Sequence, residues 1–185
     1  MDVLYWLAAA LDDFMNAGPG GWSFLLWGFA ASVPVVVVHE LGHAIVAARR
    51  LGTDVEVTVG NAVKLAQVRL GRIHASLNAL PRPGYIAGSA SFDAARATAR
   101  DVLWIALAGP FASLVGVVVT AILLSHGPAT GVFHDLLWWM TGAGVFAVVL
   151  NLLPLKVEES DGSKLWTDGR LALDALRVMQ DRPAR

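Results

Sequence analysis

The stretch VVVVHELGHAIVAA, residues 35–48, places two histidines and one glutamate inside an otherwise apolar segment. His39 and His43 are four residues apart, so on an α-helix their side chains project from the same face. From that spacing both imidazoles can reach one tetrahedral zinc ion. Glu40 lies beside them, and a carboxylate there is a competent general base for water that zinc activates. The pattern therefore predicts a metal site on a helix.

A simpler interpretation is that His39, Glu40 and His43 only form hydrogen bonds with neighbouring helices. An ionisable side chain at the centre of a bilayer costs about 2.5–3.5 kcal/mol on insertion scales. Three such groups within one helical turn therefore need a compensating role, and metal ligation supplies one. We favour the metal site for this reason.

The composition around this motif is that of a membrane protein. Hydrophobic residues make up 56% of the 185 residues and charged residues 16%, against roughly 45–50% and about 25% in soluble globular domains. The chain has no cysteine, which excludes disulfide frameworks, thiolate zinc sites and cysteine nucleophiles. Its formal net charge of -1 provides no basic field for nucleic acid. We expect one domain, 1–185, embedded in a lipid bilayer and without a nucleic-acid partner.

Residues 14–38, 102–134 and 136–155 contain no Asp, Glu, Lys or Arg, and each of these segments is long enough for a helix to cross a bilayer, which takes about 20 residues. They predict membrane spans over about 22–48, 102–124 and 136–153. The apolar segment 3–11 is too short to span, and it lacks the basic start and the cleavage site of a signal peptide. We expect an interfacial or re-entrant helix there.

The basic residues predict an orientation. Every Lys and Arg lies within 49–100 or 156–185, and the positive-inside rule assigns such segments to the cytoplasm. The N-terminus is then outside and the C-terminus cytoplasmic.

Between the first two spans the pattern changes to that of strands, over about 54–91. Val55–Val59 alternates apolar and polar residues, and Gly60-Asn61 then predicts a hairpin turn. Further strands are expected on either side of Gly71-Arg72. Leucines at helical spacing after Asp161-Gly162 predict an amphipathic terminal helix. The expected fold is a mainly α membrane protein with three transmembrane helices, a small cytoplasmic β-sheet and a C-terminal amphipathic helix.

Three motifs together resemble the site-2 proteases, a family of intramembrane zinc metalloproteases. The first is the His-Glu-x-x-His pattern of residues 39–43, the second is Asn151-Leu-Leu-Pro154 with the later Asp161-Gly162, and the third is Ala108-Gly109-Pro110. The resemblance covers nearly the whole chain. It implies the three-helix core of the family, without an appended PDZ or CBS domain.

By this resemblance Asp161 is the third zinc ligand beside His39 and His43, and Glu40 is the general base. Pro154 breaks the third helix and lets the chain turn back toward the histidines. Glu158, Glu159 or His74 are the substitutes if Asp161 is not the ligand. Asn151 either orients substrate or stabilises the oxyanion, or it caps backbone groups near the helix break; the sequence leaves both open.

The resemblance implies a zinc-dependent endopeptidase that hydrolyses peptide bonds in or near the transmembrane segment of another membrane protein. A compact core of this kind suits a bacterial inner membrane. The strands around 55–77 could offer an edge that pairs with unwound substrate. The alternative is a non-proteolytic zinc-binding membrane protein, such as a transporter or a sensing scaffold. Transport predicts further ionisable groups along the spans, and the second and third spans have none. A protease of another zinc family would use Glu158 or Glu159 as its third ligand.

Overall fold

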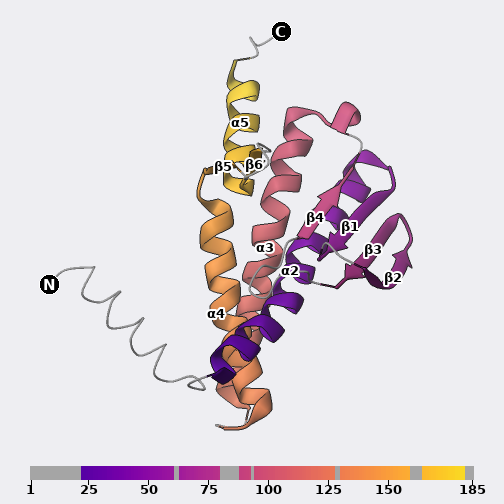
Figure 1. Cartoon of the computed structure of the whole chain (residues 1–185). Helices are drawn as coiled ribbons and strands as arrows, with labels where there is room; N and C mark the ends of the chain where they lie inside the picture. The colour runs from indigo at the N-terminus through magenta and orange to yellow at the C-terminus, as the bar shows by residue number, and fades with distance from the viewer. Residues whose placement is uncertain are drawn as a thin grey trace, which may run out of the picture.

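A computed structural model describes residues 22–60, 63–79, 88–92, 94–127, 130–158 and 164–181. Three long helices form a bundle in which each contacts the other two (Figure 1). All three are long and apolar enough to cross a membrane. They are α2 (Trp22–Leu51), α3 (Ala99–His126) and α4 (Val132–Leu152). The predicted three-span architecture is confirmed, whereas the helix expected over 3–11 lies outside the described residues.

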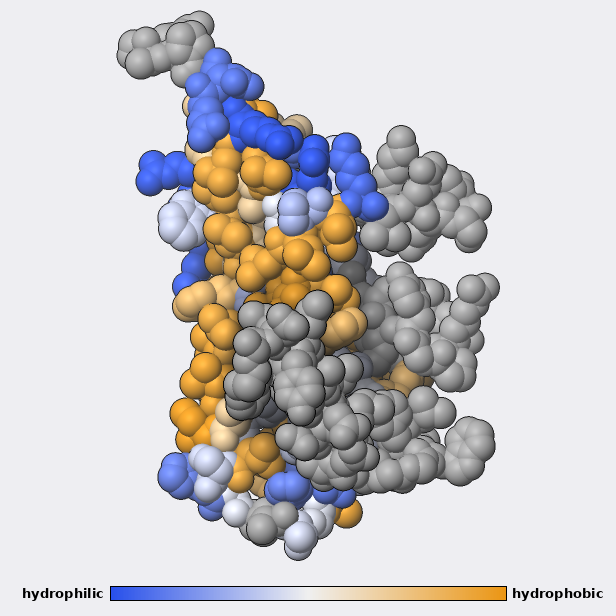
Figure 2. Space-filling view, turned by 90° about the vertical axis from the view of Figure 1, so that its left-hand side faces the viewer, coloured by the Kyte–Doolittle hydropathy of each residue, from blue (hydrophilic) through white to orange (hydrophobic). Residues whose placement is uncertain are grey.

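The outer surface of the bundle is apolar along its middle. Figure 2 shows a hydrophobic band between hydrophilic ends on the face seen there. Large side chains such as Phe111 on α3 and Phe146 on α4 are about two-thirds exposed, at 67% and 65%. Such a surface is stable against lipid tails and would associate in water. The chain is therefore a multi-pass membrane protein.

Small residues let α2 and α3 approach closely. A Cβ atom built on Gly42 would lie 2.7 Å from the Ala112 Cβ and would also collide with the Ala108 carbonyl. Interfaces between membrane helices are typically formed by small residues of this kind, because they allow the backbones to come together. Gly42, within the His-Glu-Leu-Gly-His motif, is therefore required by the packing of the two helices.

A charged cluster joins the C-terminal end of α2 to the start of α3. Thr98 and Asp101 form a capping box, in which the Thr98 hydroxyl accepts from the Asp101 amide and the Asp101 carboxylate accepts from the Thr98 amide. Arg50 donates to the same carboxylate at 2.8 Å and lies over the Trp104 ring. The cluster fixes the relative position of the two helices near His43.

Four strands form a small sheet beside α2 and α3 (Figure 1). They are β1 (Val55–Val59), β2 (Lys64–Leu70), β3 (Ile73–Asn78) and β4 (Gly88–Ser91), in the order β2-β3-β1-β4. β1 pairs with β3 in parallel and with β4 antiparallel.

The hairpin predicted at Gly60-Asn61 is wrong, because β1 and β2 are not neighbours in the sheet. The antiparallel hairpin is β2–β3, and its turn contains Gly71 at φ +61°. Pairing β1 with β3 places Ile73 beside Val55, and both side chains join the core formed with the C-terminal half of α2. Strand β2 contributes no buried residue. β1 therefore pairs with β3 rather than with β2, because β3 buries an apolar side chain in this core.

After α4 the chain forms a short antiparallel pair, β5 (Lys156–Glu158) and β6 (Lys164–Trp166), and then α5 (Asp168–Gln180). Helix α5 lies above the end of α4 and alongside α3 (Figure 1). The predicted C-terminal amphipathic helix is confirmed. Its buried residues are Ala172 and Ala175, whereas Leu176 is exposed.

The close approach at Gly42 gives a test of the helix packing. We expect Gly42→Ala to lower the free energy of unfolding by about 1–3 kcal/mol, since overpacking outweighs the better helix propensity of alanine. Gly116→Ala in α3 is the matched control, because its Cβ would meet Val38 at an ordinary 3.7 Å. Thermal unfolding in detergent measures both variants. Equal stability of the two would contradict the packing described here.

Candidate metal centre

His39 and His43 project from one face of α2 into the interior between the helices. They are 7% and 8% exposed. Their Nε2 atoms lie 3.1 Å apart, with the rings edge to face. The helical spacing therefore brings the two imidazoles to one point, as the sequence predicts.

Helix α3 holds the opposite side of each imidazole ring. His39 Nδ1 lies 3.0 Å from the Ser113 hydroxyl, and His43 Nδ1 lies 2.7 Å from the Ile105 carbonyl. A carbonyl only accepts hydrogen bonds, so Nδ1 of His43 is the donor. In a neutral imidazole Nε2 then carries the lone pair. Partners of this kind orient the histidine ligands of metal ions in proteins.

Between these two partners, Gly109 makes room for the His43 ring. A Cβ atom on Gly109 would collide with His43 Nε2. Ile105, Gly109 and Ser113 are four residues apart and therefore share one face of α3. That face therefore provides the carbonyl of Ile105 and the hydroxyl of Ser113 as partners of the two histidines, and the space at Gly109 for the His43 ring.

The third group is Asp168, the first residue of α5. Its Oδ2 lies 3.1 Å from His39 Nε2 and its Oδ1 lies 3.3 Å from His43 Nε2. Burial alone would raise the pKa of this carboxyl, but hydrogen bonds from His39 and His43 and the positive charge of these imidazoles when protonated outweigh burial and lower its pKa below the ordinary value. The carboxylate form is thus favoured at the site.

Asp168 reaches the histidines because Gly169 follows it. A Cβ atom on Gly169 would collide with the Leu152 carbonyl at the end of α4. The start of α5 therefore touches the backbone of α4, which a side chain at this position would prevent. The Asp-Gly pair thus combines a candidate ligand, Asp168, with Gly169, the residue that lets it approach the histidines.

The three side chains fit a divalent metal ion. Their candidate ligand atoms all lie within 4.8 Å of one another. Zinc with bond lengths of about 2.0–2.1 Å places neighbouring tetrahedral ligands about 3.3–3.4 Å apart, and the two Nε2 atoms, at 3.1 Å, are close to this separation, with one carboxylate oxygen of Asp168 facing each imidazole. Oδ2 of Asp168 is buried and has no hydrogen-bond partner among the described residues. A buried oxygen needs a partner, and a cation bound between the three groups would supply one.

Glu40 completes the group. It is 8% exposed, and its carboxyl is close enough to His39, His43 and Asp168 to interact with them electrostatically. Two imidazoles and one carboxylate leave a fourth tetrahedral position open, as in catalytic zinc sites. The arrangement can therefore hold a metal ion next to a free carboxyl group.

A match to peptidase family M50 covers residues 28–128, more than half of the chain. The chain belongs to this family. Membership makes it an intramembrane metalloprotease of the site-2 protease type, and the matched region contains His39, Glu40 and His43 as well as the α3 face opposite them. Searches of the curated proteins and of the solved structures found no match.

The M50 match ends before the residues that could complete the metal site, so the structure is the evidence for the third ligand. Asp161, the ligand implied by resemblance, lies outside the described residues. The acidic group that the structure places at the histidines is Asp168, which the sequence analysis missed. A signal was present, because Asp168-Gly169 is a second Asp-Gly pair and stands directly before the predicted amphipathic helix.

The other sequence candidates lie elsewhere or are not described. His74 is in β3, where its nearest acidic partner is Asp54 at 3.7 Å. The Glu158 side chain and Glu159 are outside the described part of the chain. Asn151 donates a hydrogen bond from Nδ2 to the Ala147 carbonyl at 2.9 Å, one turn earlier in α4. The Ala147 carbonyl lies within the helix rather than at its break, so both the capping role and the substrate role of Asn151 stay predictions.

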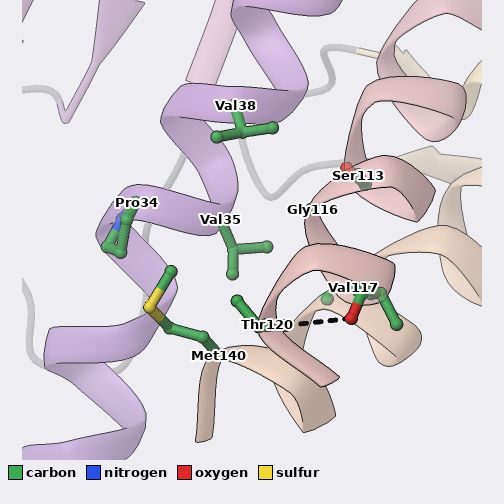
Figure 3. Close-up of a pocket in the computed structure, with 9 residues that line it drawn as sticks. Pro34, Val35, Val38, Ser113, Gly116, Val117, Thr120 and Met140 are labelled. Carbon is green, nitrogen blue, oxygen red and sulfur yellow. Dashed lines mark hydrogen bonds between the residues drawn. The ribbon is translucent and has the colours of Figure 1, made fainter. Parts of the chain in front are cut away.

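A small apolar cavity adjoins the metal centre on the side of Ser113 (Figure 3). Its volume is about 30 Å³, and its walls come from α2, α3 and α4. Val35 and Val38 line it, and Ser113 lies on its wall while bonding to His39. The cavity next to Ser113, the partner of His39, is therefore lined mainly by apolar groups.

The assignment of Asp168 predicts a difference between the two Asp-Gly pairs. We expect Asp168→Ala to weaken zinc binding more than about 100-fold, beyond the 10–100-fold typical for an outer-shell partner, because it removes a ligand. Asp161→Ala is expected to leave the affinity unchanged. Competition with a chelator measures both affinities. The opposite result would restore Asp161 as the ligand.

The contact of Ser113 with His39 gives a second prediction. Ser113→Ala removes the partner of Nδ1 and should weaken zinc binding about 10–100-fold. Ser125→Ala is the matched control in the same helix, since its hydroxyl bonds to the Ile122 carbonyl near the helix end. If both variants bind zinc like the wild type, Ser113 does not orient His39.

Proposed function

We propose that this M50 member is a zinc-dependent endopeptidase that hydrolyses peptide bonds in or near the transmembrane segment of another membrane protein. The observation that carries the proposal is the convergence of Asp168 of α5 with His39 and His43, which lie beside Glu40 on a helix that can cross a membrane. In this proposal Asp168 takes the role that resemblance gave to Asp161.

The residues have distinct roles in the proposed reaction. A zinc ion, when bound, supplies Lewis-acid activation of water and of the scissile carbonyl. Glu40 takes a proton from the attacking water and delivers it to the leaving amine. His39 and His43 keep their Nε2 atoms directed at one point because Ser113 and Ile105 hold their Nδ1 atoms. No covalent enzyme intermediate is required.

The buried position of the centre favours an apolar substrate segment. The amides of a transmembrane helix are hydrogen-bonded internally, so the substrate must unwind before its backbone can reach Glu40. The sheet beside α2 has two edge strands, β2 and β4, and an edge can pair with an extended peptide. We propose that one edge receives the unwound substrate.

The distribution of basic residues supports an orientation for this single domain, 1–185. All Lys and Arg lie in 49–100 or 156–185, so the positive-inside rule places the sheet and the C-terminus in the cytoplasm and the N-terminus outside. A bacterial inner membrane is the proposed location.

The proposal is tested by co-expression with a panel of tagged single-span membrane proteins. Glu40→Gln should reduce cleavage about 10²–10⁴-fold, because it removes the proton acceptor, while zinc content stays at one ion per chain. Glu56→Gln is the matched control, since Glu56 is an exposed residue of β1. Cleavage by Glu40→Gln at the wild-type rate would contradict the assigned base.

A further inference from the structure

Thr167 stands at the start of α5, immediately before Asp168. It is the N-cap residue, yet its side chain makes no capping hydrogen bond to its own helix. Threonine at this position ordinarily accepts a hydrogen bond from an amide in the first helical turn. The hydroxyl of Thr167 is therefore used for another purpose.

That hydroxyl binds the chain where it leaves α4. It donates to the Leu153 carbonyl and accepts from the Leu155 amide at 3.0 Å. The Thr167 amide also donates to the Leu155 carbonyl at 3.3 Å. These groups stand on both sides of Pro154, which cannot continue the backbone bonding of a helix. The Leu155 amide also donates to the Leu153 carbonyl at 2.8 Å, so Thr167 adds bonds that join this turn after α4 to the start of α5.

The location of these bonds ties the metal ligand to α4. Asp168 follows Thr167 directly, and Gly169 touches the Leu152 carbonyl. The buried residues Ala172 and Ala175 lie further along α5, so they hold the body of the helix more than its first residue. The first turn of α5 is held where α4 ends, by Thr167 and by the contact at Gly169.

We propose that Thr167 is a positioning residue whose hydroxyl clamps the start of α5 to the end of α4 and so keeps Asp168 within reach of His39 and His43. The inference rests on the proposed function, because it takes Asp168 as a metal ligand. Metal–ligand distances tolerate errors of only about 0.2 Å. A small displacement of the first turn therefore removes Asp168 from the coordination sphere.

The test uses the full chain, purified in detergent and loaded with zinc or cobalt. Thr167→Val keeps the side-chain shape and removes the hydroxyl, and we expect zinc binding to weaken at least about 10-fold, as for outer-shell partners. Thr167→Ser keeps the hydroxyl and should bind within about 3-fold of the wild type. Thr141→Val is the control, because it removes a hydroxyl that joins α4 to Thr120 of α3, away from Asp168. The visible spectrum of bound cobalt should change in Thr167→Val alone.

A double-mutant cycle separates positioning from general stability. In an Asp168→Ala background, Thr167→Val should have no further effect on zinc affinity, because Thr167 acts through Asp168. Should Thr167→Val fail to fold, Thr167→Ala replaces it in the same comparisons. The inference is overturned if Thr167→Val shows the zinc affinity and the cobalt spectrum of the wild type. It is also overturned if Thr167→Val lowers zinc affinity equally in the wild-type and the Asp168→Ala backgrounds. If instead Asp168→Ala itself binds zinc normally, the proposed ligand set fails, which is a distinguishable result.

Discussion

The structure depends on bringing two imidazoles and one carboxylate together inside a bundle of apolar helices. Each of these groups is costly to bury unless it is paired or bound to a metal ion. Their convergence requires three close backbone approaches, and a glycine stands at each. Gly42 lets α2 meet α3, Gly109 leaves space for the His43 ring, and Gly169 lets α5 meet α4. The same three glycines are thus needed for the helix packing and for the geometry of the metal centre.

Ligation and orientation are divided between helices. Helix α2 carries both histidines and Glu40, whereas α3 supplies the hydroxyl and the carbonyl that orient the two rings. The third candidate ligand, Asp168, comes from α5, which lies outside the three spans. The position of α5 therefore decides whether the ligand set is complete.

Local sequence patterns predicted the parts of the structure that depend on residues close to one another in the sequence. Helical spacing is enough to bring His39 and His43 together, and long charge-free segments are enough to predict three spans. The neighbours of β1 could not be obtained in this way, because the choice between β2 and β3 depends on which strand buries its side chains against α2.

The third ligand could not be chosen from the sequence for a similar reason. The chain has two Asp-Gly pairs, at 161–162 and 168–169, and resemblance favoured the pair nearer to Pro154. The β5–β6 pair lengthens the path after Pro154, and the bonds of Thr167 to Leu153 and Leu155 bring the later pair back to the histidines. Only the folded path of the chain distinguishes the two aspartates.

X-ray absorption spectroscopy at the zinc edge of the purified protein tests the central claim most directly. We predict one zinc ion per chain, with nitrogen and oxygen neighbours at about 2.0–2.2 Å and the multiple scattering of two imidazoles. A protein without stoichiometric metal, or a zinc shell without imidazole scattering, would contradict it.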